Sequence, residues 1–247
     1  MDTSVVLITG ALTGIGRATA LAFACGGARV VVSGRNDEDG HALVAEMHDL
    51  GLEAVFLHSD VRYESDVCNL IDEAVARFGR VDVAVNNAGS EGYPGPVLEQ
   101  TAETYAATFD TNVLGTLLCM KHELRVMQPR GSGSIVNLSS ALGQRTTLGC
   151  SVYTASKHAV EGLTKAAALE AAPFGVRVNA VAPGPIDTGM LTRFAGSEEN
   201  KDALIAGVPL RRLGHPKEIA ETIVFVASER ASFLTGQIIG VDGGKMA

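Results

Sequence analysis

The strongest constraint on the fold of this chain is a repeated alternation between short apolar runs and longer amphipathic segments. Seven runs are rich in Val, Ile, Leu and Ala without strict apolar–polar alternation: 5–8, 30–32, 54–57, 81–85, 135–138, 176–181 and 238–241. Such runs are typical of strands covered on both faces. The segments between them predict helices over about 15–26, 38–50, 64–78, 101–127, 151–173 and 216–229. We therefore expect an α/β fold: a Rossmann-type, doubly wound, parallel seven-stranded sheet with helices on both faces.

No linker divides the chain, so residues 1–247 are predicted to form a single dinucleotide-binding and catalytic domain. Two stretches interrupt the alternation, an irregular loop at 89–97 and a Gly- and Pro-punctuated excursion over 183–212. Long excursions in compact domains are typical of binding loops, and ligands of such sheets bind beyond the carboxyl ends of the strands. We therefore expect a substrate lid at about 185–212.

Composition excludes several classes of partner. Acidic residues outnumber basic ones 28 to 20, for a formal charge of −8, which argues against nucleic acid or an anionic membrane surface as a partner. No apolar run approaches the ~18 residues of a membrane span. The acidic N-terminus lacks the basic start of a secretion signal, so a cytoplasmic location is expected. The four cysteines and six histidines show no metal-ligand spacing, so we expect no metal.

A glycine-rich turn follows the first predicted strand. It reads Thr9-Gly10-Ala11-Leu12-Thr13-Gly14-Ile15-Gly16 and leads into a predicted helix. Glycines at such a turn allow backbone amides to approach a diphosphate, and the helix N-terminus adds unpaired N–H groups and a positive dipole end. The spacing differs from the commoner Gly-x-Gly-x-x-Gly, but its place between strand and helix predicts dinucleotide binding.

The end of the second predicted strand bears on the choice of cofactor. Enzymes dedicated to NAD normally carry an acid there for the ribose 2′-hydroxyl, whereas this chain has Gly34 followed by Arg35. A guanidinium suits a 2′-phosphate, so NADP(H) is favoured. NAD(H) remains possible, because the acids at 37–39 follow at once and Thr13 stands where a second base would help.

Tyr153 and Lys157 form a candidate proton-transfer pair. They lie four residues apart on a predicted helix, which places them on one face. A tyrosine has a pKa near 10, and a neighbouring ammonium favours the phenolate and lowers that pKa. The pair can then exchange a proton with a carbonyl or alcohol oxygen.

Several motifs occur in one order along the chain. These are the Thr9–Gly16 turn, Asn86-Asn87-Ala88-Gly89, Ser140 thirteen residues before Tyr153, Pro183-Gly184, and Val241-Asp242-Gly243-Gly244 near the end. Together they resemble the short-chain dehydrogenase/reductase (SDR) family in its single-domain branch. The resemblance covers essentially the whole chain and is specific for fold and reaction type, but not for substrate.

The resemblance implies a role for each matching residue. Tyr153 is the general acid/base, and Lys157 lowers its pKa and holds the nicotinamide ribose. Ser140, rather than Ser139, hydrogen-bonds the substrate oxygen, and Asn112 supports a water-linked proton relay to the lysine. In the cofactor set, Asp60 is expected at the adenine, and Ile186 and Thr188 at the carboxamide. The expected cofactor-binding residues are Gly10, Thr13, Gly14, Ile15, Gly16, Arg35, Asn36, Asp60, Val61, Asn87, Ala88, Gly89, Tyr153, Lys157, Pro183, Gly184, Ile186 and Thr188.

These observations predict an NADP(H)-dependent oxidoreductase that reversibly reduces a ketone or aldehyde to an alcohol. Two alternatives stay within the family: an NAD-linked dehydrogenase of a sugar, steroid or other secondary alcohol, and a 3-oxoacyl-carrier-protein reductase. A nucleotide-sensing binding protein is disfavoured because the Ser-Tyr-Lys set is intact. A small-molecule substrate is expected in a mainly apolar pocket, with lining from Tyr93, Leu142, Leu148, Cys150, Met190 and Leu191.

The helices at 101–127 and 151–173 carry more apolar residues than one covered face needs. Examples are Val113, Leu114, Leu117, Leu118 and Met120. The family resemblance implies pairing through these helices and a homotetramer completed by the C-terminal strand region.

Overall fold

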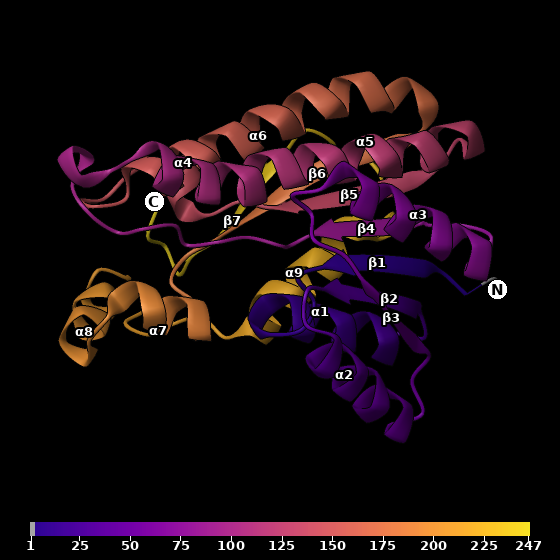
Figure 1. Cartoon of the computed structure of the whole chain (residues 1–247), viewed down its shortest axis with the longest axis horizontal. Helices are drawn as coiled ribbons and strands as arrows, with labels where there is room; N and C mark the ends of the chain where they lie inside the picture. Colours follow the sequence, from indigo (N-terminus) through magenta and orange to yellow (C-terminus); the bar gives the residue numbers. More distant parts are fainter. Residues whose placement is uncertain (1–2) are drawn as a thin grey trace.

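Seven parallel strands form one sheet in the computed structural model, which describes residues 3–247 (Figure 1). The strand order is β3-β2-β1-β4-β5-β6-β7. The strands are β1 Val5–Thr9, β2 Arg29–Gly34, β3 Ala54–His58, β4 Val83–Asn86, β5 Gly133–Leu138, β6 Val176–Pro183 and β7 Ile238–Val241. The predicted doubly wound sheet is confirmed, and each apolar run of the sequence contributes one strand.

Helices cover both faces of the sheet (Figure 1). The α-helices are α1 Gly14–Cys25, α2 Asp37–Asp49, α3 Glu64–Phe78, α4 Ala102–Phe109, α5 Gly115–Met127, α6 Ser151–Ala171, α7 Gly189–Ala195, α8 Glu198–Ala206 and α9 Pro216–Ala227. One hydrophobic core joins the sheet to α1, α2 and α9, and a second joins it to α3, α5 and α6. The central strands are mainly apolar because both of their faces are buried, whereas the edge strand β7 is only half-buried.

The order of the strands reverses between β1 and β4. β1 pairs with β2 on one side and with β4 on the other, so the turns after β1 and β4 leave the sheet side by side. Ligands of open α/β sheets bind at such a switch point. Both turns carry motifs noted in the sequence, Thr9–Gly16 and Asn86–Gly89.

The segment 101–127 was predicted as one helix, and the structure divides it. A single π-helical turn, Asp110–Leu114, separates α4 from α5. Such turns insert an extra residue into a helix and occur frequently at functional sites. Here the turn carries Asn112, which is buried.

The excursion after β6, where the sequence predicted a substrate lid at about 185–212, contains two short helices, α7 and α8. Both begin at a hydroxyl N-cap, Thr188 for α7 and Ser197 for α8. No residue of α8 is buried, so this part of the lid packs only weakly on the domain. In Figure 1 the two helices stand apart from the sheet at the lower left.

Candidate active site

The turn after β1 requires glycine at two positions. Gly10 has φ +62°, and a Cβ there would lie 2.7 Å from the Cα of Ala88. A Cβ on Gly16 would lie 2.3 Å from the carbonyl oxygen of Gly10 and 2.5 Å from Nδ2 of Asn87. The glycines therefore allow the turn, α1 and the segment after β4 to pack at backbone distance.

The N-terminus of α1 fits an anionic group. Its N-cap residue, Thr13, makes no side-chain capping hydrogen bond, and the first turn contains no acidic residue. By contrast, α2 has Asn36 as a side-chain cap and three acids in its first turn. The unpaired N–H groups of Gly14, Ile15 and Gly16 and the helix dipole suit the diphosphate of a dinucleotide, as the sequence predicted.

The segment after β4 is bonded directly to the glycine turn. Nδ2 of Asn87 donates to the carbonyl oxygens of Thr9, at 3.2 Å, and Gly10, at 2.8 Å. The amide of Ala88 donates to Oγ1 of Thr9 at 3.3 Å. These bonds fix the two loops at the switch point as one unit, with Gly89 beside them.

The base of the lid reaches the same place. The amide of Gly184, just after β6, donates to the carbonyl oxygen of Val241 at 3.0 Å. Ile186 is buried in the core, and Thr188 caps α7 by accepting from the amide of Leu191. A Cβ on Gly14 would lie 3.2 Å from Cγ2 of Thr188. The residue predicted to contact the carboxamide, Thr188, therefore lies next to the turn predicted to bind the diphosphate.

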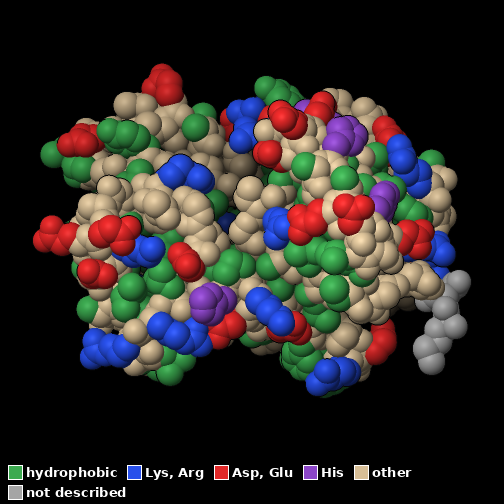
Figure 2. All heavy atoms as spheres, turned by 90° about the horizontal axis from the view of Figure 1, so that it is seen from below, with side chains coloured by type: hydrophobic (Ala, Val, Ile, Leu, Met, Phe, Trp, Pro, Cys, Tyr) green, Lys and Arg blue, Asp and Glu red, His purple; other side chains and the backbone are tan. Residues whose placement is uncertain are grey.

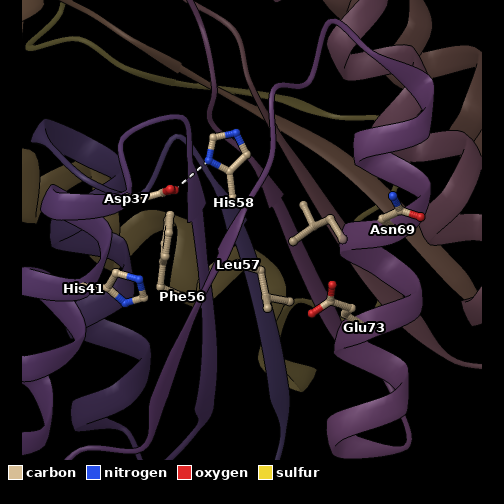
Figure 3. Close-up of a pocket in the computed structure, with 8 residues that line it drawn as sticks. Asp37, His41, Phe56, Leu57, His58, Asn69 and Glu73 are labelled. Carbon is tan, nitrogen blue, oxygen red and sulfur yellow. Dashed lines mark hydrogen bonds and ion pairs between the residues drawn. The ribbon is translucent and has the colours of Figure 1, made fainter.

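Arg35 lies exposed at the end of β2 and makes no ion pair with any residue of 3–247. The sequence left open whether the following acids neutralise it. Asp37 instead pairs with His58, whose Nδ1 lies 2.7 Å from Oδ1 of Asp37 (Figure 3). This pair borders a pocket of about 260 Å³ between α2, β3 and α3. Asn36 uses its side chain to cap α2, accepting from the amide of Asp39 at 3.1 Å.

Asp60 and Val61, expected at the adenine, are both occupied by protein contacts. The carboxylate of Asp60 forms an ion pair with Arg62, with Oδ2 2.5 Å from Nη2. This hydrogen-bonded guanidinium lowers the pKa of Asp60, against the opposing effect of burial. The side chain of Val61 packs in a core cluster with Val67 and Leu118. Because the Val61 side chain is packed in the core, only its backbone can contact the adenine.

Tyr153 projects from the first turns of α6 toward Ser140, which follows β5. Burial raises the pKa of Tyr153 to about 12, against the lowering effect of the nearby Ser140 hydroxyl. Ser139 points elsewhere and donates to Oε1 of Glu161 at 2.8 Å. Two hydroxyls therefore converge where a substrate oxygen would bind, and Tyr153 is a neutral phenol at pH 7.

Lys157 lies beneath the Tyr153 ring, with Nζ 5.7 Å from the ring centroid. Its ammonium donates to the carbonyl oxygen of Leu138 at 2.8 Å, and burial lowers the pKa of Lys157 to about 8. Burial dominates the pKa of Tyr153 in this structure, so the effect of Lys157 on that pKa stays a prediction. Its remaining N–H groups have no partner among residues 3–247 and suit ribose hydroxyls.

Asn112 ties the active-site helices together. Its Oδ1 accepts from the amide of Ser90 at 2.8 Å, and its Nδ2 donates to the carbonyl oxygen of Ser90 at 2.9 Å and to Oγ of Ser156 at 3.0 Å. Ser156 lies between Tyr153 and Lys157 on α6. Both amide hydrogens of Asn112 are therefore engaged by protein, so its side chain positions α6 against the segment after β4.

Glu91 is a site residue that the sequence did not single out. Its carboxylate raises the pKa of Tyr153 and pairs with Arg193 of α7, with Oε1 2.5 Å from Nε. The ion pair links the lid to loop 89–97 beside the catalytic hydroxyls. No sequence signal marks Glu91, because an acid in an irregular loop resembles any other exposed charge.

A second missed feature is a buried polar network under the site. Nδ2 of Asn86 donates to Oε2 of Glu123 and to Oδ1 of Asn137, each at 3.0 Å, and Nδ2 of Asn137 donates to Oγ1 of Thr164 at 2.9 Å. Oε1 of Glu123 and Oδ1 of Asn86 have no partner within residues 3–247. Burial raises the pKa of Glu123 to about 8, although its hydrogen bond from Asn86 opposes this. In its protonated form the Glu123 carboxyl supplies a hydrogen-bond donor, which this network of acceptor oxygens otherwise lacks.

The expected apolar pocket forms only in part. Cys150 is buried, and Leu142, Met190 and Leu191 are half-buried, but Leu148 is 99% exposed and Tyr93 is 56% exposed. Figure 2, which shows the molecule from below, shows the surface hollowed between the lid helices on the left and the α1–α2 side on the right. Leu148 lies on loop 144–150, outside any packed lining.

Metal-ligand clusters and membrane-spanning helices are both absent from the described part of the chain. Nowhere in residues 3–247 do three or more His, Cys, Asp or Glu side chains gather so as to hold a metal ion. Over the same residues, no helix combines the length and apolar character that crossing a membrane requires.

A diphosphate-binding turn at a topological switch point, with Ser, Tyr and Lys side chains meeting nearby, defines a nicotinamide-dependent oxidoreductase. Comparison with known proteins agrees. The family model described as enoyl-(acyl carrier protein) reductase matches residues 10–245. The chain belongs to the short-chain dehydrogenase/reductase family, whose members use NAD(P), and it is an enzyme acting on CH–OH groups.

Individual relatives cover nearly the whole chain. Cis-4-hydroxycyclohexanecarboxylate dehydrogenase of Sinomonas cyclohexanicum is 41% identical over 243 residues, 98% of this chain and 96% of that protein. 3β-hydroxysteroid dehydrogenase of Mediterraneibacter gnavus is 38% identical over 262 residues, 98% of this chain and 95% of that protein. The solved structure of ElxO with NADP bound has a TM-score of 0.93 and 37% identity, covering 99% of both chains.

Proposed function

We propose that this enzyme is an NADP(H)-dependent oxidoreductase that interconverts a ketone and a secondary alcohol on a small ring-bearing molecule. The single observation that carries the reaction is the convergence of the Ser140 and Tyr153 hydroxyls above the buried Lys157 ammonium. Two of the related proteins are named for hydroxyl groups on rings, a cyclohexanecarboxylate and a steroid. Their names support a ring-borne hydroxyl as the reacting group here.

In the proposed reaction the carbonyl oxygen accepts hydrogen bonds from Ser140 and Tyr153. The bound cofactor supplies the hydride to the carbonyl carbon. Negative charge then grows on the oxygen, where the two hydroxyls stabilise it and Tyr153 donates its proton. Lys157 holds the ribose through its free N–H groups and stabilises the phenolate that Tyr153 leaves behind.

The ionisation of Tyr153 predicts how the rate of each direction depends on pH. With a pKa of about 12, Tyr153 is protonated and ready to donate. Alcohol oxidation instead needs the phenolate, whose population rises about tenfold per pH unit below the pKa. The oxidation rate is therefore expected to rise with pH before the reduction rate falls.

Arg35 supports NADP(H) over NAD(H). Its guanidinium is exposed and unpaired within the described chain, and Asp37 is turned to His58. The predicted loss on Arg35→Ala is about 10- to 100-fold in NADPH affinity, because charge-assisted hydrogen bonds to a phosphate are strong. NADH affinity is expected to be unchanged. Arg230→Ala, an exposed arginine far from this strand end, is the matched control.

The measurement is a titration of each variant with NADPH and with NADH, followed by cofactor fluorescence. Ketones and aldehydes are then added to whichever cofactor binds. Equal weakening of both cofactors by Arg35→Ala would contradict the phosphate contact. A wild-type preference for NADH would favour the NAD-linked alternative instead.

A carrier-protein reductase has less support. Docking an acidic carrier favours a basic surface at the cleft, but three lid cations are already paired: Arg193 with Glu91, Lys201 with Asp187, and Arg212 with Glu218. In Figure 2 acidic and basic side chains are interspersed around the lid. A free small molecule fits this surface better.

For assembly we propose a homotetramer paired through the α4–α5 and α6 faces. Leu118 and Met120 were counted from the sequence among the apolar residues beyond those one covered helix face needs, but both are core residues. Leu114 and Leu117 are 39% and 44% exposed. Leu169 on α6 is 80% exposed. Apolar residues gathered on helix faces are typical of subunit contacts. Light scattering should report four chains per particle, and a monomer would overturn the proposal.

A further inference from the structure

The C-terminal tail joins three segments that border the active-site hollow. The carbonyl oxygen of Val241 accepts from Gly184 at the lid base, at 3.0 Å, and that of Gly243 accepts from Leu210 at the lid end, at 3.2 Å. The carbonyl oxygen of Lys245 accepts from Nη1 of Arg145 at 2.5 Å. In Figure 1 the C-terminus lies between the lid helices and α4.

Arg145 belongs to the loop that connects the two catalytic hydroxyls. This loop runs from Ser140 to α6, which carries Tyr153, and Oγ1 of Thr146 lies 3.1 Å from Oγ1 of Thr154. Because Ser140 and Tyr153, at the two ends of this loop, lie near each other, the loop closes on itself beside the position of the substrate oxygen. Arg145 and Lys245 therefore meet where this loop, the lid and the tail come together.

The two cations lack acidic ion-pair partners. Arg193, Lys201 and Arg212 of the lid each pair with a carboxylate, but no carboxylate pairs with Arg145 or Lys245 within residues 3–247. Arg145 uses one donor on a backbone oxygen. The Lys245 ammonium donates to no group in the same part of the chain, although the side chain is half-buried.

One carboxylate, Asp242, acts on the Lys245 ammonium. Burial lowers the pKa of Lys245 and the Arg145 guanidinium lowers it further, whereas Asp242 raises it. Asp242 is also held by the amide of Gly244, at 2.9 Å from its Oδ1. Two cations against one anion leave an excess positive charge in a chain whose formal charge is −8.

We propose that Arg145 and Lys245 form a subsite for a substrate carboxylate, so that the enzyme acts on a ring alcohol or ketone that also bears an acid group. The proposal rests on the proposed function, because it extends the same cleft. A carboxylate held there removes the repulsion between the two cations. Its charge-assisted hydrogen bonds orient the ring with its carbonyl toward Ser140 and Tyr153.

The test compares 4-oxocyclohexanecarboxylate with its neutral methyl ester on the NADP-dependent enzyme. Wild type should show a lower KM for the acid. Lys245→Met and Arg145→Met should each raise the KM of the acid about tenfold and leave the ester unchanged. Lys165→Met, an exposed lysine on α6, is the matched control. Binding of the acid and the ester to the NADP⁺-loaded proteins is measured in parallel by calorimetry.

The outcomes separate this subsite from the reaction itself. Equal kinetics for acid and ester, or equal effects of the variants on both, would overturn the subsite while leaving carbonyl reduction intact. Acid binding that depends on Lys245 and Arg145, without turnover of either compound, would support the subsite and contradict the reaction. Failure of the loaded protein to bind the acid would overturn the subsite outright.

Discussion

Replacement of Tyr153 by Phe is expected to lower the turnover number by roughly 10²- to 10⁴-fold, because the proton donor to the substrate oxygen is lost. The ring remains, so its packing over Lys157 and the fold are preserved. Ser140 keeps one hydrogen bond to the substrate oxygen but lacks a base to receive or replace its proton. Steady-state rates of NADPH oxidation with a ketone substrate measure the loss.

Two controls make the Tyr153→Phe result specific. The affinity for NADPH should change little, because the substitution removes no group that holds the diphosphate or the 2′-phosphate. Tyr105→Phe, at a half-exposed tyrosine on α4, should keep the wild-type rate. A Tyr153→Phe enzyme with wild-type turnover would show that another group moves the proton.

The second large effect is on stability and concerns Glu123. The pKa of this carboxyl is raised by burial from an ordinary value of 4.5 to about 8. Between these values the folded protein keeps a proton that the unfolded chain has lost. The free energy of unfolding should therefore fall by about 1.4 kcal/mol per pH unit from roughly pH 5 to 8 on account of this group, and level off above pH 8.

Glu123→Gln isolates this contribution because the amide is neutral at every pH and can still accept from Asn86. Urea unfolding of both proteins from pH 5 to 9 gives the difference in stability at each pH. That difference should grow in favour of the variant up to about pH 8. Glu170→Gln, an exposed glutamate on α6, should run parallel to wild type. Parallel curves for Glu123→Gln would mean that the buried carboxyl is ionised or solvated.

The fold was predictable because its signals are local. Apolar runs identify all seven strands, and the glycine turn after β1 identifies the switch point. The break within 101–127 was not predictable, since Asp110–Leu114 contains no Gly or Pro to mark it and a π-turn adds only one residue. The lid helices were also missed, because glycines and prolines punctuate them and α8 buries nothing.

The candidate site shows a similar division. The motifs identify Ser140, Tyr153 and Lys157, and the structure brings these side chains together. The net direction of the Tyr153 pKa was not predictable, because burial, which no spacing reveals, outweighs the lowering effect of Ser140, and the charges of Cys150 and Glu91 raise the pKa further. The pairing of Asp37 with His58 depends on how α2 packs against β3, and a linear sequence does not contain that distance.

The most direct test of the central claim is transfer of deuterium from a secondary alcohol to the cofactor. Wild type is incubated with NADP⁺ and a panel of ring and open-chain secondary alcohols deuterated at the carbinol carbon, and the reduced cofactor is analysed by mass spectrometry. The account predicts NADPH that carries one deuterium, formed with at least one alcohol and lost in Tyr153→Phe. Reduced cofactor without the label, or NADP⁺ that binds but is reduced by none of these alcohols, would contradict it.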